Sequence, residues 1–69
     1  MKRLKELRNK RHISQIRLAM ELSMSQHSIS RYETGAREAD YETLIAIADY
    51  FGVSIDYLLG RTDNPKVAR

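Results

Sequence analysis

Residues 14–33 read SQIRLAMELSMSQHSISRYE, and this stretch decides the fold. Ser14 and Ser25 are good helix N-caps, and apolar residues follow each of them at helical spacing. We therefore expect one helix over about residues 14–22 and another over about residues 25–34. Only two residues separate these helices, too few for them to run comfortably antiparallel, so the helices must cross at a steep angle.

The residue sizes at this crossing favour close contact. Ala19 is small at the point of nearest approach, while Leu22 and Ile29 seal the corner between the helices. This is the packing of a helix-turn-helix motif. On spacing alone, a generic helical hairpin remains the alternative.

The second of these helices has a polar outer face without an acid. At about 100° per residue, one arc contains Gln26, His27, Ser30 and Arg31. Ser28, Ile29 and Tyr32 face the other way. Gln can pair with adenine and Arg with guanine, and His can donate or accept a hydrogen bond. The alternative is an ordinary solvated helix face.

Apolar spacing predicts three further short helices on either side of residues 14–33. One runs from about Lys2 to Lys10, one lies between Asp40 and Gly52, and one follows Ser54 and ends at Gly60. The first has Leu4 and Leu7 inward, and the second matches the helical template at Tyr41, Leu44, Ile47, Ala48 and Phe51. The third carries Tyr57, Leu58 and Leu59. The fold class is all-α with five helices. The domain spans residues 1–60, and residues 61–69 form a polar tail that we expect to be flexible.

Length and composition exclude several classes of protein. A chain of 69 residues has room for one domain and little room for a deep active-site cavity, so we do not expect an enzyme. There is no cysteine, and His12 and His27 are isolated, so we expect no disulfide, metal or cofactor. Apolar runs are too short to span a bilayer and no secretory leader is visible, which favours a cytoplasmic protein without a membrane segment.

Charge is unevenly placed along the chain. The net charge is +3, but residues 1–17 hold seven basic side chains and one acidic one, a local charge of +6, and the remainder carries −3. This asymmetry suits a polyanionic partner, and double-stranded DNA is the partner we expect. The alternative is a solvated basic helix face.

From Leu4 to Gly60 the chain resembles the Cro and phage-repressor type helix-turn-helix regulators, the XRE family. The resemblance is carried by LKELR at 4–8, ISQ at 13–15, LA at 18–19, SQ at 25–26, SISRYE at 28–33, Gly35, ETL at 42–44, Ala48, FGVS at 51–54 and DYLLG at 56–60. It implies a five-helix, lambda-repressor-like DNA-binding domain. It also implies a sequence-specific regulator, with repression the expected outcome, that reads a palindromic operator as a homodimer with half-sites about one DNA turn apart.

The resemblance also assigns roles to individual residues. The residues implied to contact bases are Gln26, His27, Ser28 and Arg31. Those implied to contact phosphates are Gln15, Ser30, Arg37 and Arg8. Arg8 and Glu33 match a pair that forms a partly buried ion pair. Ile55, Tyr57 and Leu58 are the expected dimer surface.

Two departures from the family pattern stand out. Ser23 occupies a turn position where the family prefers glycine, because the backbone there is often left-handed. Ile16 and Met20 lie one helical turn apart where relatives usually carry charges. They are either scattered exposed residues or a contact patch for a protein partner. In the second case the chain would be a protein-interaction module of the antitoxin or antagonist-binding kind. Non-specific DNA binding is a third alternative.

Overall fold

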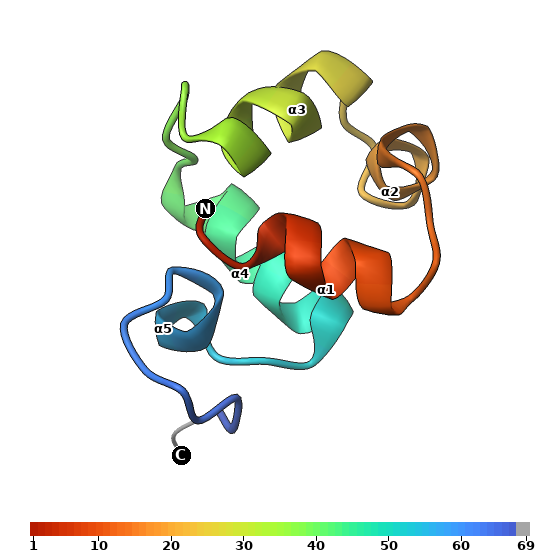
Figure 1. Ribbon diagram of the computed structural model, residues 1–69. Coiled ribbons are helices and arrows are strands. Elements are labelled where there is room, and N and C mark those ends of the chain that lie inside the picture. The colour runs from red at the N-terminus through yellow and green to blue at the C-terminus, as the bar shows by residue number, and fades with distance from the viewer. Residues whose placement is uncertain (68–69) are drawn as a thin grey trace.

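The computed structural model describes residues 1–67, and within that range it contains five α-helices and no strand. The helices are α1 (Leu4–Lys10), α2 (Gln15–Glu21), α3 (Gln26–Thr34), α4 (Tyr41–Phe51) and α5 (Ile55–Leu58). α1 crosses the centre of the molecule, with α2 and α3 on one side and α4 and α5 on the other (Figure 1). The prediction of an all-α, five-helix, lambda-repressor-like fold is confirmed.

Side-chain caps define where four of the helices begin. Ser14, Ser25, Asp40 and Ser54 each accept a hydrogen bond from the backbone N–H three residues later. Such a bond satisfies one of the N–H groups that a helix start leaves free. α1 has no such cap and begins at Leu4 instead of the expected Lys2. Its start is held from a distance, because the backbone N–H of Arg3 donates to the carbonyl of Leu58 at 3.1 Å.

Each helix contributes one fully buried aliphatic side chain to the core. These five residues are Leu4, Leu18, Ile29, Ile47 and Leu58. Burying each of them stabilises the fold by roughly 1.5–3 kcal/mol. All five helices therefore depend on one shared core.

Two sequence-based placements are wrong. Leu58 was expected on a dimer surface, but it is 0% exposed because α5 points it into the shared core. Tyr41 fits the apolar period of α4, yet it is 82% exposed because the first residue of that helix lies beyond the packed face. Ile55 and Tyr57, the other residues of the expected dimer surface, are half-buried.

The segment after α5, which we expect to be a flexible tail, makes contacts with the helical domain. The backbone N–H of Ser54 donates to the carbonyl of Pro65 at 2.9 Å. The Arg3 guanidinium donates to the Thr62 carbonyl at 3.2 Å and to the Asp63 carboxylate at 2.7 Å. Residues 62–65 are thus fastened to both ends of the fold, whereas the expectation for residues 68–69 lies outside the described residues.

Candidate nucleic-acid interface

A tight turn joins α2 to α3. Ala19 is 3% exposed at the crossing, and its carbonyl accepts a hydrogen bond from the N–H of Met24 at 2.8 Å. Ser23, between the two helices, has a φ of 55°, the left-handed conformation that its position suggested. The buried side chains of Leu18 and Ile29 hold the two helices together beneath the turn. The outer face of α3 is thereby set on a rigid support.

The outer face of α3 presents the polar side chains that sequence periodicity placed there. Gln26, His27 and Arg31 are exposed, and Ser30 is half-buried. Within residues 1–67, the Arg31 guanidinium has no hydrogen bond or ion pair. Ser28 is also half-buried, and its hydroxyl accepts from that of Ser25 at 3.0 Å. The exposed set can donate and accept hydrogen bonds, as the edges of base pairs in a major groove require.

A chain of hydrogen bonds anchors Gln26. Its Nε2 donates to Oε1 of Gln15 at 2.7 Å, and Nε2 of Gln15 donates to Oε1 of Glu33 at 2.9 Å. Gln15 therefore connects the start of α3 to its end. Gln26 keeps its carbonyl oxygen and one N–H free, which is the pair of groups that a bidentate contact to adenine uses.

The chain ends in the Arg8–Glu33 ion pair. Nε of Arg8 donates to Oε2 of Glu33 at 2.6 Å, and the two side chains are 11% and 3% exposed. A second bond joins Nη2 of Arg8 to Oε1 of Glu33 at 3.3 Å, and Nη1 donates to the carbonyl of Ile13 at 2.9 Å. The Arg8 guanidinium thus ties together α1, the loop after it and α3. This leaves Arg8 little free surface for a phosphate.

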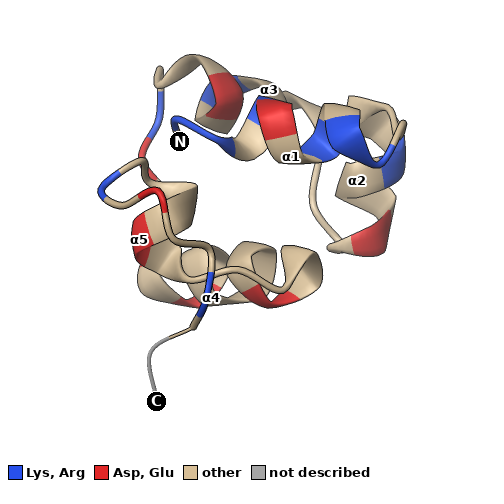
Figure 2. Ribbon diagram, turned by 60° about the horizontal axis from the view of Figure 1, so that its bottom comes forward, with Lys and Arg blue, Asp and Glu red and all other residues tan. Residues whose placement is uncertain are grey.

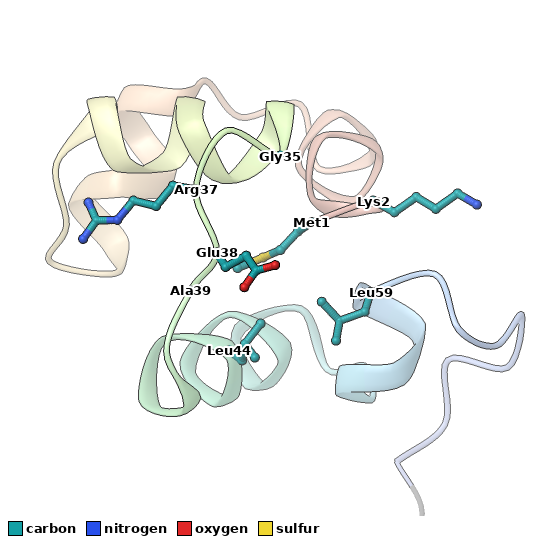
Figure 3. Close-up of a pocket in the computed structure, with 8 residues that line it drawn as sticks. All are labelled: Met1, Lys2, Gly35, Arg37, Glu38, Ala39, Leu44 and Leu59. Carbon is teal, nitrogen blue, oxygen red and sulfur yellow. The ribbon is translucent and has the colours of Figure 1, made fainter.

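Arg37 lies in the loop after α3. Its guanidinium is 5.8 Å from the centre of the Tyr32 ring. Nearby is a cavity of about 410 Å³ lined by Met1, Lys2, Gly35, Arg37, Glu38, Ala39, Leu44 and Leu59. Figure 3 shows the charged ends of Arg37 and Lys2 pointing away from this cavity. Arg37 is exposed, and its guanidinium points away from the cavity and lies near the Tyr32 ring.

The arginines of the N-terminal region make contacts within the protein, although Arg11 and Arg17 are exposed. The Arg3 guanidinium lies 4.3 Å from the Tyr57 ring centre, and that of Arg11 lies 5.0 Å from the Phe51 ring centre. Arg17 pairs with Glu21 at 2.9 Å on the surface of α2. Arg8 pairs with Glu33, so every arginine of residues 1–17 has a partner within the fold.

The two halves of the fold still differ in charge. Lys and Arg lie mainly along α1, the loop after it and α2, whereas α4 and α5 carry acids and no Lys or Arg (Figure 2). One of the acids near α4, Asp40, has a pKa lowered by hydrogen bonds from the side chain and backbone of Thr43, with a smaller effect of the Arg37 charge. A polyanion would therefore approach the α1–α3 side of the molecule.

Among residues 1–67, no group of three or more His, Cys, Asp or Glu side chains could hold a metal ion. No helix in that part of the chain is long and apolar enough to cross a membrane.

Two features of the site escaped the sequence patterns. Gln15 was expected to contact phosphate, yet its side chain also bridges Gln26 and Glu33. Arg3 was not singled out, although it binds the carbonyl of Tyr57 at 2.9 Å as well as the tail. Both depend on residues distant in sequence, so local periodicity carries no signal for them. For Gln15, the sequence indicated only that it lies at the start of a helix, where a phosphate can bind.

Comparison with known proteins agrees with this geometry. The chain is 41% identical over 64 residues to the uncharacterized HTH-type transcriptional regulator YqaE of Bacillus subtilis (strain 168), covering 93% of this chain and 55% of YqaE. It is 38% identical over 65 residues to the HTH-type transcriptional regulator ImmR of the same organism, covering 94% and 51%. The HTH-type transcriptional activator BcrR of Enterococcus faecalis is 37% identical over 57 residues, covering 83% and 28%.

The chain thus spans about half the length of YqaE and ImmR. No solved structure gives a significant match. The family model described as helix-turn-helix matches residues 4–58, which include all five helices. The chain therefore belongs to the XRE-type helix-turn-helix family of DNA-binding transcriptional regulators.

Proposed function

We propose that this domain reads a specific, two-fold symmetric operator as a homodimer, with α3 in the major groove, and that it represses transcription by occupying promoter DNA. The observation that carries the proposal is the fixed orientation of Gln26. Gln26 donates to Gln15, Gln15 donates to Glu33, and Glu33 pairs with Arg8. These contacts orient the free groups of the Gln26 amide before DNA binds. Such preorganisation reduces the entropy lost on binding.

Roles for the surrounding residues follow from where they lie. Gln26, His27 and Arg31 are exposed on α3 and are proposed to read base edges, with half-buried Ser28 beside them. Gln15 retains one N–H of its amide for a phosphate, in addition to its bridging bonds. We propose Ser30 and exposed Arg37 as further phosphate contacts, and we assign Arg8 to the ion pair.

The dimer is proposed because one small module contacts too little DNA. A single DNA-binding module buries roughly 600–1,000 Å², less than specific regulators commonly bury. Two copies bound to half-sites about one turn apart would double that contact. Ile55 and Tyr57 remain partly exposed at the end of the domain and are the proposed contact between copies.

Selection of bound sequences from a random duplex library at physiological salt tests the proposal. The parent should enrich a two-fold motif. Gln26→Ala and Arg31→Ala should each remove the base preference at one position of every half-site. The lost base contact should weaken binding by about 1–3 kcal/mol. Gln15→Ala should weaken the base preference at the position that Gln26 reads, because it removes the hydrogen bond that orients Gln26.

Arg61→Ala is the matched control for Arg31→Ala, because it removes the same charge from an exposed residue after α5. It should leave the motif intact. Enrichment of no motif by a folded parent that still binds DNA would indicate non-specific binding and contradict the proposal. A promoter reporter, repressed by the parent and released by Arg31→Ala, tests the direction of regulation.

A second candidate function rests on the surface of α2. Ile16 and Met20 are 62% and 72% exposed, one helical turn apart, in a position to form an apolar contact for a protein partner. If the fold serves mainly as a protein-interaction module, Ile16→Asp should abolish cellular function while Arg31→Ala leaves it intact. The opposite result favours the DNA-reading function.

A further inference from the structure

The outer face of α4 carries two large apolar side chains that the fold leaves exposed. Tyr41 is 82% exposed and Ile45 is 48% exposed. Residues four apart are neighbours on a helix surface, so these two side chains form one row, and exposed Asp49 continues it one turn later. Exposed Glu42 begins the adjacent row. We call Tyr41, Glu42, Ile45 and Asp49 the α4 face.

The carboxylates of the α4 face have no basic neighbour on their own helix. On α2, by contrast, the acid Glu21 pairs with Arg17 one turn away at 2.9 Å, and α1 contains a similar pair. α4 has no Lys or Arg, and within residues 1–67 neither Glu42 nor Asp49 forms an ion pair. The α4 face is therefore both apolar and negatively charged.

A groove of about 350 Å³ adjoins this face, because Ile45 and Asp49 also line the groove. Val53 and Val67 add apolar side chains to its lining, and Asp56 adds an exposed carboxylate. α4 lies on the side of the molecule opposite α2 and α3 (Figures 1 and 2). A partner bound here leaves the outer surface of α3 free for DNA.

Charge determines which class of partner fits this surface. Double-stranded DNA and anionic lipid surfaces are negatively charged, so the exposed carboxylates repel both. A second copy held face to face by a two-fold axis would bring the acids of both copies into one interface, because such a contact pairs a surface with itself. A basic partner instead supplies an opposite charge for each carboxylate.

We propose that the α4 face and the adjoining groove bind a basic amphipathic helix of another protein. Its apolar side chains, spaced three and four residues apart, lie against Ile45 and in the groove. Its basic side chains pair with Glu42 and Asp49, and an arginine stacks on the exposed ring of Tyr41. The domain thereby carries such a protein to the DNA that α3 contacts, a role beyond operator binding itself.

A synthetic helix of about four turns, with leucines on one face and lysines and arginines on the other, serves as the probe. It is titrated into the isotope-labelled chain without DNA, and amide chemical shifts report where it binds and how tightly. We expect the largest shifts at residues 41–49 and at Val53. Two control peptides, one scrambled and one with glutamate at each basic position, should bind far more weakly.

Variants of the chain test each kind of contact. Glu42→Gln/Asp49→Asn removes both charges and should raise the dissociation constant of the probe on the order of fivefold. Tyr41→Ala removes the exposed ring and should raise it by a similar factor. Glu6→Gln/Glu21→Gln is the matched control, because it removes two exposed carboxylates from α1 and α2 instead, and it should bind the probe like the parent. Thermal melts establish that all variants are folded.

Three results would overturn the docking site. The first is a probe that does not bind, and the second is equal weakening in the matched control, which would mean that net charge alone attracts the peptide. The third is a dimer of the parent, measured by sedimentation without DNA, that Tyr41→Ala dissociates, because the α4 face would then join two copies.

Sequence selection separates this inference from the proposed function. Tyr41→Ala should enrich the same DNA motif as the parent, since α4 lies away from the outer surface of α3. A changed motif would assign the α4 face to DNA binding and contradict the docking site. If the parent enriches no motif but binds the probe on α4, the proposed operator reading fails and the docking site stands.

Discussion

Within residues 1–67, two residues other than glycine adopt the left-handed backbone region, and both lie in the turns that flank α2. His12 has a φ of 57° and Ser23 a φ of 55°. A residue with a Cβ is strained there by roughly 1–2 kcal/mol, a strain that glycine avoids. The family preference for glycine made Ser23 predictable, whereas nothing in the local sequence singled out His12.

Ser23→Gly should stabilise the protein. Removing the strain gains about 1 kcal/mol, and the greater freedom of glycine in the unfolded chain returns about half of it, leaving a net gain of about 0.5 kcal/mol. The urea midpoint of unfolding measures this change. Ala46→Gly, at an exposed position inside α4, is the control and should destabilise by about 1 kcal/mol. A midpoint that falls in Ser23→Gly would show that the turn depends on the serine.

Among the helices, boundaries were easier to predict than exposure. Ser14, Ser25, Asp40 and Ser54 act within three residues of themselves, so local sequence was sufficient to place the four helix starts that they cap. Exposure depends on what packs against a helix from elsewhere in the chain. Tyr41 fits the apolar period of α4 and is still 82% exposed.

The same distinction applies to the site. The polar arc of α3 follows from its 3.6-residue period, and exposed Gln26, His27 and Arg31 lie on it. The bond from Gln26 to Gln15 spans eleven residues, and the bond from Arg3 to Asp63 spans sixty. Periodicity carries no information on such pairs, so neither bond was predictable from sequence pattern alone.

The cap of α4 should make stability depend on pH. Hydrogen bonds from Thr43 lower the pKa of Asp40 below its ordinary value of 3.8. A lowered pKa means that the folded state prefers the carboxylate, so this contribution is fully present above 3.8 and is lost as the pH falls through the folded-state pKa. Asp40→Asn keeps a good cap but does not titrate.

Urea midpoints of the parent and Asp40→Asn measure this contribution. The parent should lose stability relative to the variant as the pH falls from about 5 to about 3. Asp49→Asn, at an exposed position inside α4, serves as the control for removing a negative charge from this helix. A constant difference between the parent and Asp40→Asn across this range would contradict the assigned role of the carboxylate.

Variants of the Arg8–Glu33 ion pair, which joins α1 to α3, test protein stability and DNA reading separately. Glu33→Ala leaves the buried guanidinium of Arg8 without its carboxylate and should cost about 3 kcal/mol. A domain of this size is stable by roughly 3.5–10 kcal/mol, so most of the variant should still be folded in the absence of urea. The double variant Arg8→Met/Glu33→Leu should recover most of the loss, because apolar residues of similar size replace buried ion pairs well.

DNA reading should not recover with stability in this double variant. Gln15 donates to Glu33, so leucine there leaves Gln15 without its acceptor and Gln26 without a fixed support. Urea unfolding measures the stability, and affinity for the selected operator measures the reading. Glu21→Ala breaks an exposed pair on α2 and should cost under about 0.5 kcal/mol. Restored affinity in the double variant would show that the hydrogen-bonded chain is dispensable.

For the whole molecule, the charge counted from the sequence differs from the charge free to meet DNA. Residues 1–17 carry a net charge of +6, yet all four of their arginines have partners within the fold. Arg37 is exposed in the loop after α3, lies near the Tyr32 ring, and makes no ion pair within residues 1–67. Phosphate binding should therefore depend on position more than on the count of basic residues.

The salt dependence of operator binding distinguishes these two kinds of arginine. Each phosphate contact releases counterions and adds about 0.9 to the slope of log affinity against log salt concentration. Arg37→Ala should reduce that slope by about 1 for each copy bound, with little change in stability. Arg11→Ala removes an equal charge, but its guanidinium packs over the rings of Tyr50 and Phe51, so it should lower stability and leave the slope unchanged. Equal effects of the two variants on the slope would mean that net charge, and not the geometry of α3 and its flanking loop, holds the DNA.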